Sequence, residues 1–168
     1  MNKTGVIYGI NGPVVYLKGN TGFKMSEMVY VGKERLVGEV IALTKDTTTV
    51  QVFEETTGLK PGETVTASGD ALSVTLGPGI LNNIFDGIER PLSEIAAKSG
   101  KYISRGLTVD SLDTEKKWDV HVTVSEGEEL MGGAIIAETQ ETRSIVHKSM
   151  VPPDVNGTVI WAAKDGKY

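Results

Sequence analysis

Residues 6–17, VIYGINGPVVYL, decide the fold of this chain. Apolar and other side chains alternate along Val6–Ile10, and the pattern resumes at Val14–Leu17 after the break at Asn11-Gly12-Pro13. Asn-Gly between two such runs is the turn chemistry of a β-hairpin. The stretch therefore predicts two antiparallel strands joined by a tight turn.

Four more short strands are predicted in the rest of the first 70 residues. They are Met28–Val31, Leu36–Leu43, Thr47–Phe53 and Thr64–Ala67, with a Lys60-Pro61-Gly62-Glu63 turn before the last. In Thr47–Phe53, Val50 and Val52 face one side while Thr49 and Gln51 face the other. A closed barrel buries short strands without leaving open edges. We therefore predict a small six-stranded β-barrel domain over residues 1–70.

Residues 71–104 are predicted to be a connector. Leu72–Leu76 alternates and is expected to lead out of the barrel. Beyond Pro78-Gly79, a first helical piece is predicted because its apolar residues fall at helical spacing: Ile80, Leu81, Ile84 and Phe85. This apolar face is expected to be exposed and to promote self-association. Pro91 ends that piece, and Ser93 is expected to cap a second short helix, Glu94–Lys98, that ends at Gly100.

Residues 105–168 are predicted to form a second β-rich domain. Val120, Val122 and Val124 alternate with Asp119, His121 and Thr123, and further strands are predicted at Gly133–Thr139, Ser144–Lys148 and Thr158–Ala162. Pro152-Pro153 forms a rigid break. Because the chain stops close behind the last strand, we expect this domain to be truncated and Thr158–Ala162 to lack a strand partner. The predicted fold class is mainly β, with two β domains and a short helical connector.

The amino-acid composition argues against several classes of protein. The 168 residues include no cysteine, which excludes disulfides and thiolate zinc sites. Seventeen basic and 22 acidic residues give a formal charge of −5, which argues against nucleic acid as the main partner. No apolar run approaches the ~20 residues that span a bilayer, and the N-terminus has no signal-peptide pattern, so no direct membrane insertion is expected.

No phosphate loop of the form G-x-x-x-x-G-K-[ST] occurs in the sequence. Gly127–Gly132 has the glycine spacing, but Gly133 and Ala134 stand where the loop needs Lys and Ser/Thr. We interpret this segment as a turn before a strand. Gly77-Pro78-Gly79 lacks the third glycine of a dinucleotide fingerprint.

The titratable residues give no catalytic set. His121 and His147 have no second ligand at metal-binding spacing, and His121 is placed on the polar side of its strand. The pairs Glu54-Glu55 and Glu128-Glu129 cannot act as carboxylate dyads, because adjacent residues on a strand point to opposite faces. Trp118 and Trp161 are expected either in a core or as interface anchors. We therefore predict no catalytic, cofactor-binding or metal-binding residue in this chain.

Several stretches, in this order and spacing, resemble the amino-terminal part of the catalytic A subunit of V/A-type rotary ATPases. They are Gly5-Val6, Asn11–Val15, Leu36–Val40, Gln51–Leu59 and Gly77–Leu92, which reads GPGILNNIFDGIERPL. Further landmarks resemble that subunit's insertion, called the bulge or non-homologous region: Ser104-Arg105-Gly106, Lys117-Trp118-Asp119, His147-Lys148, Pro152-Pro153 and Gly157–Val159. Asn156 stands where the family commonly has Arg.

The resemblance implies a structural role within a motor that couples ATP hydrolysis or synthesis to H⁺ or Na⁺ transport. The barrel would join B subunits and other A subunits in a crown, and the bulge would serve coupling through peripheral stalk subunits. ATP and Mg²⁺ would be bound by the full-length parent and not by this fragment, which would be inactive alone. The complex would lie on the cytoplasmic side of a membrane, as a peripheral part of a membrane-bound assembly. For Glu54-Glu55 the resemblance favours a structural or interface role.

Two alternatives stay open at this point. One is a stand-alone β-barrel adaptor with no ATPase role, which predicts closed sheets where the fragment hypothesis predicts an unfinished bulge. The other is a small enzyme, which would need a nucleophile or metal set that the sequence does not offer.

Overall fold

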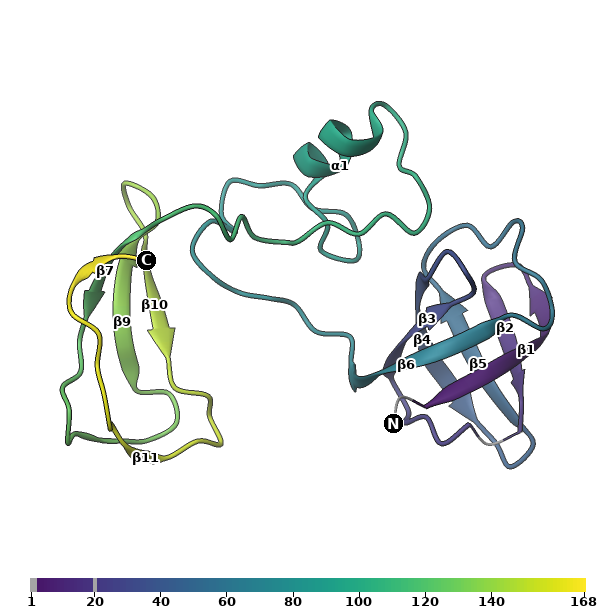
Figure 1. Ribbon diagram of the computed structural model, residues 1–168, viewed down its shortest axis with the longest axis horizontal. Helices are drawn as coiled ribbons and strands as arrows, with labels where there is room; N and C mark the ends of the chain where they lie inside the picture. The colour runs from purple at the N-terminus through teal and green to yellow at the C-terminus, as the bar shows by residue number, and fades with distance from the viewer. Residues whose placement is uncertain (1–2, 20) are drawn as a thin grey trace. The chain divides into compact units, whose positions relative to one another are not determined.

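The computed structural model describes residues 3–19 and 21–168 and contains two compact units (Figure 1). The first unit comprises Met1–Val74 and Asp86–Val109, and the second comprises Thr75–Phe85 and Asp110–Tyr168. The chain therefore crosses between the units three times, at residues 74/75, 85/86 and 109/110, and the predicted connector is divided between them.

Six antiparallel strands close the barrel of the first unit. They are β1 (Thr4–Asn11), β2 (Val14–Lys18), β3 (Glu27–Val31), β4 (Leu36–Leu43), β5 (Thr47–Val52) and β6 (Thr64–Ala71), in the order β1-β2-β5-β4-β3-β6. The predicted six-stranded barrel and the mainly β fold class are confirmed. The last strand is longer than predicted, because β6 continues past Ala67 and pairs Ala71 with Glu27 of β3.

The first hairpin shows how a short turn sets the register. Asn11 pairs with Val14, so the loop consists of Gly12 and Pro13. Gly12 has a φ of 56°, and the ring of Pro13 fixes a negative φ after it. Positive φ at the first loop position and negative φ at the second is the pattern of a type II′ turn, so glycine acts here at the first position rather than in an Asn-Gly type I′ turn.

Alternation along each strand fills the barrel interior. Ile7 is buried while Val6 and Tyr8 on either side are exposed. Val50 and Val52 face the interior as predicted. The core consists of Ile7, Val15, Leu17, Phe23, Val29, Val31, Leu36, Val40, Val50, Val52, Val65 and Ala67. Every member of this core belongs to the barrel, so the barrel has its own hydrophobic interior.

The connector differs from the prediction. Residues 80–85 are not helical, because Gly79 (φ 103°) and Asn82 (φ 66°) adopt left-handed backbone that a right-handed helix excludes. Two of the predicted apolar residues, Leu81 and Ile84, are exposed. Leu72–Leu76 leaves the barrel without strand pairing.

One helix forms in the described part of the chain, α1 (Leu92–Ser99), and it begins directly after Pro91. No side chain caps its N-terminus, so the predicted Ser93 cap is wrong. Pro91 is extended (φ −63°, ψ 126°) and precedes the first helical residue, which leaves Ser93 inside the first turn. Gly100 ends the helix with a φ of 74° and donates its N–H to the carbonyl of Ala96.

The second unit holds six short strands. They are β7 (Asp119–Val122), β8 (Glu129–Leu130), β9 (Ile135–Gln140), β10 (Val146–Met150), β11 (Gly157–Thr158) and β12 (Gly166–Lys167). Four of them form an antiparallel sheet in the order β10-β9-β7-β12, and β11 pairs with β8.

The prediction that Thr158–Ala162 lacks a strand partner is wrong. Thr158 pairs with Glu129, and Val159 continues the ladder by exchanging hydrogen bonds with Glu128 and Gly127. The extended pairing stops there, so Ile160 and Trp161 lie outside any strand. The partner comes from the Gly127–Leu130 segment, which the sequence pattern showed only as a turn.

Within the two described ranges, no helix is long and apolar enough to cross a membrane.

Candidate functional site

The most elaborate group of polar side chains joins residues 86–109, which we call the strap, to the barrel. The side chain of Arg90, only 10% exposed, donates from Nε to Asp86 Oδ2 (2.8 Å) and from Nη1 to the carbonyl of Leu107 (3.0 Å). Its Nη1 also lies 3.6 Å from Glu54 Oε2, which accepts the backbone N–H of Gly106 at 2.9 Å. One arginine and one barrel carboxylate therefore fix both ends of the strap.

Asp86 is tied into the same group through its backbone neighbours. Its Oδ1 accepts the N–H groups of Ile88 (3.1 Å) and Arg90 (2.9 Å). Burial raises the pKa of Asp86, but the hydrogen bonds from Arg90 and Ile88 together outweigh it, so this pKa lies below its ordinary value. Asp86 thus stays ionised beside the guanidinium.

Arg105 makes a second attachment at the barrel surface. Its Nη1 donates to the carbonyl of Thr57, and its Nη2 lies 3.1 Å from the carboxylate of Glu34. The hydroxyl of Thr57 donates to Glu55 Oε1 (2.6 Å), and this bond lowers the pKa of the Glu55 carboxyl. Arg105 therefore contacts two barrel loops, the one after β5 and the one between β3 and β4.

Gly106 must be glycine for two reasons. Its φ of 64° lies in the left-handed region, and an added Cβ would collide with the carbonyl oxygen of Glu34. The strap backbone therefore rests directly on the β3–β4 loop.

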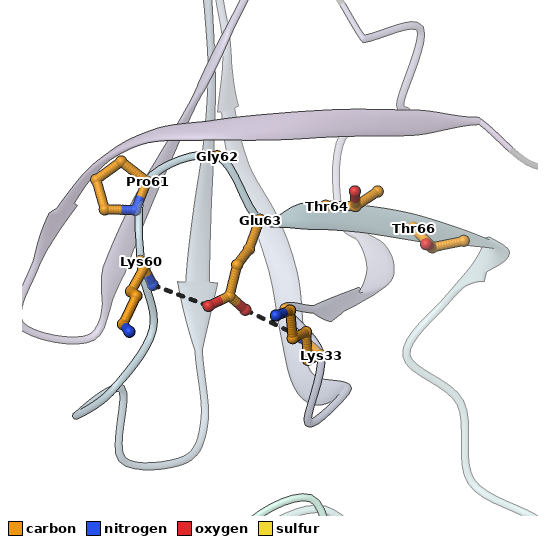
Figure 2. Close-up of a pocket in the computed structure, with 8 residues that line it drawn as sticks. Lys33, Lys60, Pro61, Gly62, Glu63, Thr64 and Thr66 are labelled. Atoms are coloured by element: carbon orange, nitrogen blue, oxygen red, sulfur yellow. Dashed lines mark hydrogen bonds between the residues drawn. The ribbon is translucent and has the colours of Figure 1, made fainter.

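A shallow hollow on the barrel lies beside the turn before β6 (Figure 2). It is lined by Gly32, Lys33, Lys60, Pro61, Gly62, Glu63, Thr64 and Thr66. Figure 2 shows the carboxylate of Glu63 between the two lysine backbones, accepting the N–H of Lys60 (3.2 Å) and of Lys33 (3.0 Å). Both oxygens of Glu63 are thus engaged in joining two loops, which is a structural use of the carboxylate.

The two histidines have acidic neighbours that the sequence did not reveal. His121 Nδ1 lies 2.7 Å from Asp165 Oδ2, and Asp165 Oδ1 accepts the N–H of Val122 (2.8 Å). The hydrogen bond to Asp165 raises the pKa of His121, and the bonds from Val122 and His121 lower the pKa of Asp165. His121 is exposed on the polar side of β7, as predicted.

His147 lies 3.7 Å from the buried carboxylate of Glu141, whose Oε1 accepts the N–H groups of Gly79 (2.8 Å) and Leu81 (3.0 Å). The two histidines belong to separate pairs rather than to one site. Each pair holds a neighbouring segment of the second unit in place.

The remaining sequence candidates also lie in structural settings. Glu128 is in the turn before β8 and its Oε2 accepts the N–H of Ser125, while Glu129 is on β8 itself. Trp118 is partly buried under the ammonium group of Lys116, whereas Trp161 is 71% exposed. Among the described residues, no three His, Cys, Asp or Glu side chains gather in a way that could hold a metal ion.

Sequence reasoning missed the Glu54–Arg90 contact, although both residues were part of the stretches that carry the family resemblance. The two positions are 36 apart along the chain, with β6 between them, so no periodicity could pair them. The one available signal was an acidic residue after a barrel strand together with the two arginines at 90 and 105 in the segment that follows the barrel.

Comparisons with known proteins cover both units. A family model described as the beta-barrel domain of the ATP synthase alpha/beta family matches residues 7–69. A second, described as the barrel-sandwich domain of the ATP synthase alpha/beta subunit, matches residues 109–168.

Individual relatives match along almost the whole chain. The V-type ATP synthase alpha chain of Halothermothrix orenii is 51% identical over 168 residues, which is all of this chain and 28% of that protein. The A subunit of the A-type ATP synthase of Methanosphaera stadtmanae is 50% identical over 98% of this chain and 28% of its own length. The corresponding A subunit of Pyrococcus abyssi is 46% identical over all of this chain and 16% of its own length.

The chain thus spans 28% or less of the length of these three relatives. Two models of the ATP synthase alpha/beta family match the two β-rich parts of the chain. The relative from Halothermothrix orenii is likewise named as an ATP synthase alpha chain. The chain belongs to the ATP synthase alpha/beta family, within the group of V- and A-type A subunits.

Proposed function

We propose that this chain is the N-terminal region of the A subunit of a V/A-type rotary ATPase or ATP synthase, where it serves assembly and coupling rather than catalysis. The observation that carries this proposal is a match at 51% identity, over the whole length of this chain, to part of a protein named V-type ATP synthase alpha chain. The parent enzyme would couple ATP hydrolysis or synthesis to H⁺ or Na⁺ transport. This region would lie on the cytoplasmic side of the membrane.

Nucleotide chemistry is assigned to the rest of the parent protein. The phosphate loop needs a Lys for the β/γ-phosphates and a hydroxyl for Mg²⁺, and the sequence of this chain has no such motif. In the proposal, ATP and Mg²⁺ are therefore bound outside these 168 residues.

The barrel is proposed to contact neighbouring A and B subunits. Its outer wall carries apolar side chains, with Val6 54%, Tyr8 51% and Phe53 40% exposed. The rings of Tyr8 and Tyr16 lie 6.2 Å apart and form an aromatic pair on that wall. Aromatic side chains are enriched at protein interfaces, which supports a contact role for this wall.

The second unit is proposed to contact the peripheral stalk. Ile160 is 93% exposed and the adjacent Trp161 is 71% exposed. A neighbouring pair of large apolar side chains fits an interface anchor, and Trp is common among the residues that dominate binding energy. This favours the interface role over the core role for Trp161.

A chimera tests the proposal. The matching segment of the Halothermothrix orenii alpha chain is replaced by this chain, and the chimera is mixed with the B subunit of the same organism. We expect a complex of the same mass as the parental one by native mass spectrometry, with ATPase activity retained. A folded chimera that stays unassembled would contradict the proposal.

Two variants that each place a glutamate on the barrel surface separate the barrel wall from general charge effects; Lys45→Glu changes the net charge by −2 and Tyr8→Glu by −1, so the control carries the larger charge change. Tyr8→Glu, on the proposed contact wall, is expected to weaken assembly. Lys45→Glu, in the exposed turn between β4 and β5, is the matched control and is expected to assemble normally. Equal assembly of both variants would remove the barrel wall from the proposed interface.

A further inference from the structure

The strap is held on the barrel without taking part in the barrel's hydrophobic core. All core members lie between Ile7 and Ala67. The buried apolar residues of the strap are Pro91 and Ile95, and neither is a member of that core. Since apolar burial is the dominant stabilising contribution in folding, the largest contribution to the stability of the barrel comes from its own residues.

Ionic and polar contacts attach the strap instead. Arg90 reaches Glu54, and Arg105 reaches Glu34 and the carbonyl of Thr57. The barrel supplies the carboxylates and the strap supplies the guanidinium groups, so the two surfaces are complementary in charge. Such contacts are weakened by salt where they are exposed, and Arg105 is 33% exposed.

The buried part of the attachment is also incompletely satisfied. The side chain of Glu54 is 7% exposed, and its Oε1 has no hydrogen-bond partner among the described residues. A buried carboxylate oxygen without a donor is costly. This lowers the stability of the attachment relative to the fully paired strands of the barrel, and regions of low local stability open independently of the rest.

Opening of the strap would affect the connections between the two units, because the strap lies between two of the three crossings. The strap begins at the 85/86 crossing and ends at the 109/110 crossing between the two units. While the strap is attached, both of these crossings start from fixed points on the barrel. When it is detached, only the crossing at 74/75 still starts from a barrel-anchored segment.

We propose that the strap is an electrostatic latch, which opens and closes on the barrel as one unit while the barrel stays folded. Arg90 with Glu54 is its buried contact, and Arg105 with Glu34 is its exposed contact. Opening leaves the crossing at 74/75 as the one connection that still starts from a barrel-anchored segment, so the latch sets whether one or three such connections link the barrel to the second unit.

Hydrogen exchange of the whole chain, followed by mass spectrometry, tests the latch. Arg90→Met removes the contacts to Glu54, Asp86 and Leu107 while keeping a long side chain. We expect amides of residues 86–107 to exchange at least tenfold faster, because each 1.4 kcal/mol lost is a factor of about ten. Amides of β2, β4 and β5 should be unchanged.

Matched variants make the test specific. Arg143→Met, at an exposed position of the second unit, is the control and is expected to leave strap exchange unchanged. Gly106→Ala keeps every charge but forces the backbone off the Glu34 carbonyl, and it is expected to loosen the strap like Arg90→Met. Loss of protection in strap and barrel together would show that both belong to one cooperative unit and would overturn the latch.

A salt titration of the chain without substitutions tests the latch as well, and its result cannot come from a variant that fails to fold. Raising NaCl to about 1 M shortens the screening length to about 3 Å, so exchange in the strap is expected to quicken while exchange in the barrel does not. Strap exchange that is independent both of salt and of Arg90→Met would show that ionic contacts do not hold it, and would also overturn the proposal.

Discussion

Leu17 and Gly5 provide a quantitative test of the barrel core. Leu17 is fully buried on β2, and truncating it to alanine in a well-packed interior costs about 2–5 kcal/mol. Gly5 on β1 faces the same space, because a Cβ added there would lie 2.8 Å from Leu17 Cδ1 and 2.7 Å from Thr21 Cγ2. Overpacking of this kind costs about 1–3 kcal/mol, so Gly5→Ala alone should also destabilise.

The double variant should be more stable than the sum of the two changes predicts. The methyl group that Gly5→Ala introduces enters the space that Leu17 Cδ1 leaves, so the clash with Leu17 and part of the cavity disappear together, while the close contact with Thr21 Cγ2 stays. Since residues in contact couple by roughly 0.5–3 kcal/mol, we expect a favourable coupling of about 1 kcal/mol.

Hydrogen exchange of the β2 and β5 amides, measured at increasing urea concentrations, gives the free energy of unfolding of the barrel alone. Both tryptophans, Trp118 and Trp161, belong to the second unit, so their fluorescence does not report on the barrel. Leu72→Ala, at a side chain 40% exposed beyond the last barrel strand, is the control and should change stability by about 0.5 kcal/mol or less. Additive effects of Gly5→Ala and Leu17→Ala would refute the packing described here.

Two further predictions concern the second unit. Because Asp165 raises the pKa of His121, the stability that this pair gives to β12 is fully present below the unfolded pKa of 6.5 and is lost as pH rises through the higher folded pKa. The protection factors of the β12 amides, which are corrected for base-catalysed intrinsic exchange, should therefore fall on the alkaline side, and Asp165→Asn should abolish this fall; an unchanged profile in that variant would disprove the assignment. Glu141→Ala should destabilise the second unit by about 1–3 kcal/mol, since it leaves the N–H groups that its carboxylate accepts, including that of Gly79, without their acceptor. Fluorescence of Trp118, whose ring lies against Gly79, measures this in urea; Glu141→Gln retains an acceptor and should cost less, and equal stability of both variants with the parent would contradict the role of Glu141.

The barrel could be predicted from the sequence because its determinants are local. Alternation in Thr47–Phe53 and the turn residues around Gly12 and Gly62 each specify a strand or a turn within a few positions. Closure then follows from the need to bury strand edges. The structure agrees because the buried side chains of β5 are those that the alternation selects.

The connector could not be predicted in the same way. Apolar spacing at Ile80, Leu81, Ile84 and Phe85 fits a helix, but spacing carries no information on the left-handed backbone at Gly79 and Asn82.

The ionic contacts of the strap depend on tertiary structure. Glu54 and Arg90 are separated along the chain by β6, and His121 and Asp165, 44 positions apart, lie together where β12 pairs with β7. Residue type at these positions indicated charge, but only the fold reveals the partners.

The central claim is that these residues form the non-catalytic N-terminal region of an A subunit whose nucleotide site lies further along the polypeptide. Reading the coding sequence past the codon for Tyr168 tests it most directly. The account predicts that the frame continues and encodes a G-x-x-x-x-G-K-[ST] phosphate loop. A stop codon directly after Tyr168 would contradict it, because the chain would then have no motor domain to assemble.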